Sequence, residues 1–72
     1  MKILYRNTTG NLIAIEASCL CVTSYATSYE WTVIADVTGN NSDEYLVIAE
    51  NKSKEEAERI LMELFETGRY LP

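Results

Sequence analysis

The sequence of 72 residues contains no histidine, a single proline and only three glycines. The missing histidine excludes nucleophilic sites of the Ser-His and Cys-His kind. The proline is the last residue and the glycines stand singly, so the chain has neither a Pro/Gly-rich linker nor a phosphate-binding glycine loop. We therefore expect one domain spanning residues 1–72 that carries no catalytic residues and is not an enzyme.

Cysteine is almost as scarce, with only Cys19 and Cys21 present. On a strand these two side chains face the same way, with Cα atoms near the outer limit for a disulfide. Two thiolates supply half of a zinc site, and no third cysteine or histidine exists to complete it. We expect free thiols that are buried or half-buried, without a metal or a cofactor. A bridge between two chains, or an adventitious metal bound by the thiols, is the alternative.

Basic residues are few, with six Lys and Arg against eleven Asp and Glu and a net charge of −5. Nucleic-acid binding takes most of its affinity from Lys and Arg that neutralise phosphates, and anionic membranes attract the same side chains. We therefore expect no nucleic-acid partner and no membrane partner. Arg6 and the polar residues 7–11 interrupt the apolar start of the chain, which argues against a signal peptide and favours a cytoplasmic protein.

The C-terminal third has the clearest local pattern. Ser53 and Glu56 have the spacing of a capping box, which marks the start of a helix. The apolar residues behind it recur at helical spacing, and Gly68 stands where a helix commonly ends. These apolar residues are Ala57, Ile60, Leu61, Leu64 and Phe65. The pattern predicts a helix over 54–67.

The rest of the chain has the composition of strands separated by short turns. The predicted strands are 2–6, 12–16, 19–24, 29–38 and 44–50. Whether residues 12–24 form one bent strand or two stays open. Short connections favour antiparallel neighbours, and one terminal helix must cover one face of the sheet. The predicted fold is α+β, an antiparallel β-meander of four to five strands packed against one C-terminal α-helix.

Three segments carry a resemblance to a known group of proteins. They are Met1-Lys2-Ile3-Leu4, the apolar strand 45–49, and Ser53-Lys54-Glu55-Glu56-Ala57-Glu58-Arg59-Ile60-Leu61. In this order they resemble short, uncharacterised β-meander-plus-C-terminal-helix proteins of low-GC Gram-positive bacteria and their phages. The resemblance implies the architecture and a bacterial or phage source, and it implies no site residues.

The chain holds more apolar surface than one sheet face and one helix stripe can use. Strand 44–50 is apolar on both faces, Ile34 interrupts the polar face of its strand, and Met62 lies outside the helix stripe. Either the sheet curls around part of its second face or a partner covers it. Self-association is the simplest form of such cover, and a foreign protein is the alternative.

Two further features suggest where a partner binds. Tyrosine and tryptophan are common in interfaces, although here they can also pack across strands. Eight acidic side chains lie within 42–66, where they form either a solvated face or a surface for a basic partner. The candidate partner-binding residues are Tyr25, Tyr29, Trp31, Ile34, Leu46, Ile48, Glu55, Met62, Glu63 and Glu66.

The function predicted from these features is a small cytoplasmic protein-binding module. We expect the module to form a homodimer. The same features are those of a phage or mobile-element protein that modulates or inhibits a host protein. One alternative is a purely structural self-assembly domain without a foreign partner. Another is an anti-CRISPR or anti-restriction inhibitor that uses its acidic face against a basic host protein.

Overall fold

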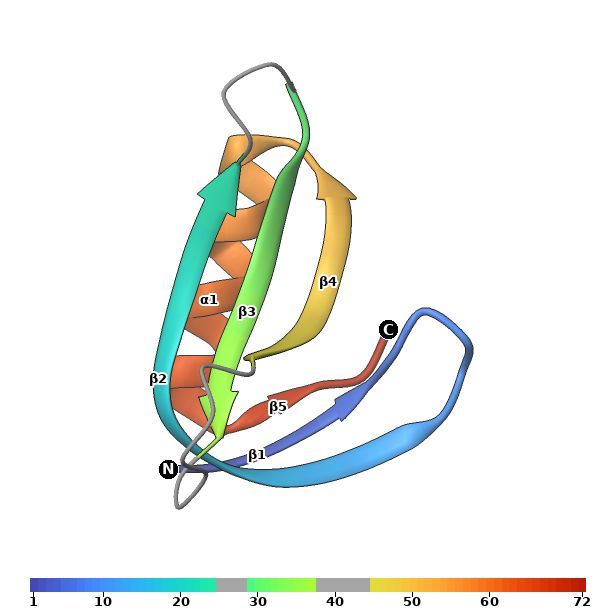
Figure 1. Cartoon of the computed structure of the whole chain (residues 1–72), viewed down its shortest axis with the longest axis vertical. Helices are drawn as coiled ribbons and strands as arrows, with labels where there is room; N and C mark the ends of the chain where they lie inside the picture. The colour runs from blue at the N-terminus through green and yellow to red at the C-terminus, as the bar shows by residue number, and fades with distance from the viewer. Residues whose placement is uncertain (25–28, 38–44) are drawn as a thin grey trace.

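A computed structural model describes residues 1–24, 29–37 and 45–72. It contains a sheet in the order β4-β3-β2-β1-β5 and one helix packed against that sheet (Figure 1). The predicted α+β class, with a largely antiparallel sheet and one C-terminal helix, is confirmed. The elements are β1 (Lys2–Arg6), β2 (Leu12–Ser24), β3 (Trp31–Val37), β4 (Tyr45–Lys52), α1 (Lys54–Thr67) and β5 (Arg69–Tyr70).

Residues 12–24 form one strand with a strong bend, which answers the question that the sequence left open. The first part of β2 pairs with β1, from Leu12 to Glu16, and the second part pairs with β3. The register shifts between Ala17 and Cys19, so Ser18 is the extra residue of a bulge. A bulge bends its strand and reverses which residues face each side. This is why β2 can serve two differently directed parts of the sheet.

A second irregularity lies in β4, where the pairing with β3 shifts twice. Val33 pairs with Ala49 whereas Ile34 pairs with Val47, so Ile48 is the extra residue. Ile48 and Ala49 are consequently both buried, at 1% and 3% exposure. The alternation expected for strand 44–50 is therefore wrong at this point. The bulge, rather than a partner, places part of the apolar surplus in the core.

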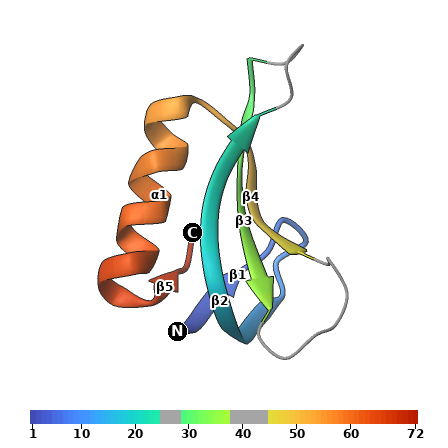
Figure 2. The same cartoon turned by 60° about the vertical axis from the view of Figure 1, so that its left-hand side comes forward.

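The helix α1 has the bounds and both caps that the sequence predicts. The Ser53 hydroxyl accepts a hydrogen bond from the Glu56 N–H at 3.2 Å. Gly68 ends the helix in the left-handed conformation, and its N–H donates to the Leu64 carbonyl. The helix buries Ala57, Ile60 and Leu64 and lies along one face of the sheet (Figure 2).

The short strand β5 was not predicted, and it pairs with β1 in parallel. The Leu4 N–H donates to the Gly68 carbonyl at 2.8 Å, which holds the end of the helix against β1. The sheet is thus a meander of four strands with a parallel fifth strand added at its β1 edge. Within the described residues, the structure shows no helix that is long and apolar enough to cross a membrane.

The core lies between the helix and the sheet face that it covers, and every described strand except β5 contributes fully buried residues. Its largest buried side chain is Tyr5, which is 2% exposed. The buried hydrophobic residues are Ile3, Tyr5, Ala17, Val33, Ala35, Ile48, Ala49, Ala57, Ile60 and Leu64. These buried residues come from the helix and from the sheet face that it covers, and the bulge in β4, rather than curling around the second face, brings Ile48 into this core.

Candidate protein-interaction surface

The second part of β2 leaves one of its backbone edges open. Its other edge pairs with β3, whereas β1 pairs with residues 12–16 and Met1 hydrogen-bonds to Ala17. Among the described residues, no strand pairs with residues 18–24 on the side opposite β3. This open edge forms one border of the sheet (Figure 1), and the same border faces the viewer in Figure 2.

An apolar groove runs beside the open edge, between β2 and α1. Its volume is about 480 Å³, and Met1, Leu20, Leu61, Met62, Phe65 and Glu66 line it. Phe65 is 75% exposed and Met62 is 61% exposed. Phe65 belongs to the predicted helix stripe, but the sheet ends at the open edge of β2 and leaves this side of the helix uncovered.

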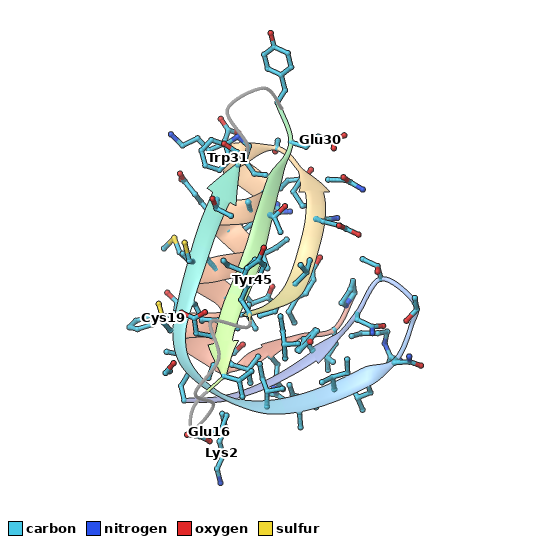
Figure 3. All side chains as sticks on the ribbon, viewed as in Figure 1. Lys2, Glu16, Cys19, Glu30, Trp31 and Tyr45 are labelled. Atoms are coloured by element: carbon cyan, nitrogen blue, oxygen red, sulfur yellow. The ribbon has the colours of Figure 1, made fainter. Side chains whose placement is uncertain are left out.

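Both cysteines are free and exposed, which corrects the expectation that they are buried or half-buried. The bulge at Ser18 explains the difference, because it turns Leu20 and Val22 toward the helix and the two thiols to the opposite face. The thiol of Cys19 lies 3.7 Å from the Leu20 carbonyl oxygen. The thiol of Cys21 lies 3.6 Å from the Val22 carbonyl oxygen. Figure 3 shows Cys19 at the open border of β2.

The aromatic candidates do not gather into one site. Tyr25 lies outside the described residues, and Tyr29 is 98% exposed. Trp31 is half-buried, and the Lys54 ammonium lies 5.5 Å from its ring centroid. This distance allows a cation–π contact, which holds the start of α1 over β3. Trp31 therefore has a structural role that the sequence pattern did not indicate.

The candidates on β3 and β4 are divided between the two faces of the sheet. Ile34 and Val47 are paired on the face opposite the helix, where a pocket of about 300 Å³ also includes Tyr45. Tyr45 lies over this face in Figure 3. Leu46 is 36% exposed, whereas Ile48 is a core residue and is not part of any exposed surface.

The acidic candidates Glu55, Glu63 and Glu66 are all exposed on α1, and at 3.6 residues per turn they lie on the side of the helix away from its buried residues. Glu66 lines the apolar groove together with Met62. Glu63 instead lines a small depression with Arg69 and Leu71. Of the predicted residues, the structure brings only Met62 and Glu66 to the groove beside the open edge.

The residues that the sequence reasoning missed are Met1, Leu20, Leu61 and Phe65, which complete the groove. Leu61 and Phe65 were assigned to the core as members of the helix stripe. The sequence features that could have indicated the groove are the width of the helix stripe and the two cysteines that flank Leu20. A helix that only covers a sheet rarely has an apolar residue outside its stripe, so Met62 indicates a second apolar side of the helix.

Tyr5 is a titratable side chain that the fold buries. Burial raises the pKa of the Tyr5 phenol above its ordinary value, and Tyr5 lies in the core rather than in the groove. Within residues 1–24, 29–37 and 45–72, no three His, Cys, Asp or Glu side chains gather closely enough to hold a metal ion. The groove can make apolar contacts with a partner, and the open edge can make backbone hydrogen bonds. Comparison of the chain with protein-family models, with curated proteins and with solved structures finds no match.

Proposed function

We propose that this chain is a small protein-binding module and that its partner is a second copy of itself. The observation that carries the proposal is the open edge of β2 lying directly beside an apolar groove. Backbone groups at a strand edge pair readily with another strand, and an adjoining apolar groove adds area that a partner can bury.

The three edges of the sheet differ in how they are protected. Natural edge strands are commonly protected by charged side chains, bulges, proline or short length. The β4 edge carries Glu50, Lys52 and two bulges, and β5 is only two residues long. Residues 18–24 read Ser-Cys-Leu-Cys-Val-Thr-Ser, without a charge or a proline. This contrast supports strand pairing at β2 rather than elsewhere.

A modulator of a basic host protein, from a phage or mobile element, is the second candidate. The exposed carboxylates of Glu55, Glu63 and Glu66 favour it, because acidic surfaces attract basic partners. Glu66 lines the apolar groove whereas Glu63 lines a separate depression, so these carboxylates do not share one pocket and support this candidate less than the groove supports self-association. A purely structural self-assembly domain uses the same β2 surface and differs only in lacking a foreign partner.

Sedimentation velocity tests the proposal directly. We expect a monomer–dimer equilibrium that shifts with protein concentration between about 1 and 500 µM. The double variant Met62→Ser/Phe65→Ser should be monomeric over this range because it removes the exposed apolar side chains of the groove. Glu55→Ser is the matched control on the same helix and should dimerise like the wild type. A wild-type chain that stays monomeric throughout contradicts the proposal.

A further inference from the structure

We propose that two copies join by antiparallel pairing of their β2 edges, with the two-fold axis at Cys21, so that one sheet continues through both chains. This inference rests on the proposed self-association and specifies its geometry. It follows from the direction of the free backbone groups of β2, from the bulge at Ser18 and from the apolar groove beside the edge.

The free backbone groups can be assigned from the hydrogen bonds of Ala17. Its N–H donates to the Met1 carbonyl and its carbonyl accepts from the Met1 amino group, so both groups point away from β3. The extra residue Ser18 reverses the alternation beyond this point. The groups that point to the open edge are therefore those of Leu20, Val22 and Ser24. The thiol contacts at the Leu20 and Val22 carbonyl oxygens agree with this assignment.

An antiparallel partner must place its own outward groups opposite these groups. In a symmetric pair this allows an axis at Leu20, at Cys21 or at Val22. An axis at Leu20 would bring Ser24 of one copy opposite Glu16 of the other, where Lys2 of β1 already pairs. An axis at Val22 leaves Ser18 and Cys19 without partners inside the strand. The axis at Cys21 places the outward groups of Leu20 opposite those of Val22 and keeps every residue of 18–24 opposite another residue of the same range, with Ser24 opposite the bulge residue Ser18.

The pairing also covers the groove. A two-fold axis perpendicular to the sheet places both helices on the same face of the joined sheet, running in opposite directions. Met62 and Phe65 of each copy then stand between the two helices, in contact with their counterparts. This arrangement is isologous, as closed dimers require, because the same surface of each copy makes the contact.

The area available fits a weak but specific dimer. Phe65 and Met62 are more than half exposed, and Met1 is 46% exposed. With the strand edge they offer about 600 Å² per copy, or about 1,200 Å² in total, which is the lower limit for a specific interface. A second copy provides this interface area without any further element of structure. The N–H and carbonyl groups of its β2 edge pair with those of the first copy.

The two cysteines provide a direct test of the axis. At an axis through Cys21 the two Cys21 residues form a non-hydrogen-bonded pair, with Cα atoms about 4.5 Å apart, within the range for a disulfide. The two Cys19 residues are then offset by four positions and lie about 13 Å apart, which is too far. Cys19→Ser, which retains Cys21, should therefore form a disulfide-linked dimer. Cys21→Ser, which retains Cys19, should not.

The oxidant in the experiment is diamide, an azo compound that takes two electrons and two protons from a pair of thiols and is reduced to the hydrazine. Each variant is oxidised at a concentration where sedimentation shows dimer, and the products are separated by non-reducing electrophoresis. The same reaction in urea measures collisional cross-linking. We expect at least tenfold faster cross-linking for Cys19→Ser than for Cys21→Ser under native conditions, and equal rates in urea.

The outcomes separate this inference from the proposed function. If both variants are dimers by sedimentation but Cys21→Ser cross-links as fast as Cys19→Ser, the β2 axis is wrong while self-association stands. If both variants and the wild type remain monomers, the proposed function itself fails. Rapid, selective cross-linking through Cys21 that disappears in Met62→Ser/Phe65→Ser supports both.

Discussion

Met1 and Ala17 exchange two backbone hydrogen bonds, of 2.6 Å from the Met1 amino group and 2.7 Å from the Ala17 N–H. The Met1 amino group also lies 3.4 Å from a Glu16 carboxylate oxygen, which strengthens this end of the β1–β2 ladder. The bulge at Ser18 follows immediately, and there β2 turns away from β1. This pair of residues therefore sets the point at which β2 changes from a central strand to an open edge.

Cys21→Glu should dissociate the dimer without unfolding the monomer. Two carboxylates directly opposite each other on neighbouring strands are destabilising, and the exposed Cys21 side chain makes few contacts within its own chain. We expect the dimer dissociation constant from sedimentation to rise at least tenfold. Ala14→Glu is the matched control, because Ala14 is exposed on the part of β2 that already pairs with β1. Equal weakening by both substitutions would falsify the assignment of the edge.

Salt should strengthen self-association. Each chain has a net charge of −5, and Glu58 and Glu66 stand one helical turn on either side of Met62. Like charges therefore approach one another when two copies join, and added salt screens this repulsion. We expect tighter dimerisation on going from low to moderate NaCl concentration, measured by sedimentation. Binding of a basic partner through the acidic residues would show the opposite trend, so the sign distinguishes the two candidate functions.

The sequence predicts the elements with local signals well and the irregular positions poorly. The helix bounds follow from Ser53, Glu56 and Gly68 because capping chemistry depends on residues that are close in the chain. The bulges at Ser18 and Ile48 have no such local signature, since they are fixed by the pairing of distant strands. Each bulge reverses an alternation, and this is why the exposure of Cys19 and the burial of Ile48 were not foreseen.

The candidate surface was predictable only in part for the same reason. An excess of apolar side chains can be counted from composition, and Met62 was identified by its position outside the helix stripe. The groove depends on where β2 turns away from β1 and on how far the helix extends past the sheet edge. Neither quantity has a pattern in the sequence, because both depend on the bend of β2.

Gly68→Ala should destabilise the fold. Gly68 has a φ of 73°, and a Cβ atom there would lie 3.0 Å from the Lys2 carbonyl oxygen. The left-handed conformation costs a non-glycine residue roughly 1–2 kcal/mol, and the contact with backbone adds to this. We expect a loss of about 2 kcal/mol in the free energy of unfolding, measured by urea titration with the fluorescence of Trp31. Gly10→Ala, where no atom lies within 4 Å of the added Cβ, should cost less.

Asn51 should respond to substitution in two directions. Its φ of 60° lies in the left-handed region next to the irregular pairing of β4, and asparagine tolerates this region better than most residues. Asn51→Gly should leave the free energy of unfolding unchanged or raise it slightly, whereas Asn51→Val should lower it by about 1–2 kcal/mol. The same urea titration measures both. A loss with glycine as large as that with valine would show that the asparagine side chain, and not the backbone conformation, matters.

Stability should fall at high pH because of Tyr5. Burial disfavours the phenolate and raises the pKa of Tyr5 in the folded chain above its unfolded value of about 10. Above that pH the unfolded chain releases the phenol proton more readily than the folded chain, so the free energy of unfolding decreases as the pH rises. Below the unfolded pKa the contribution is constant. Tyr5→Phe removes the titrating group and should therefore show a smaller decrease above pH 10, measured by urea titration over a series of pH values. If the two proteins lose stability in parallel, the alkaline decrease arises from other groups.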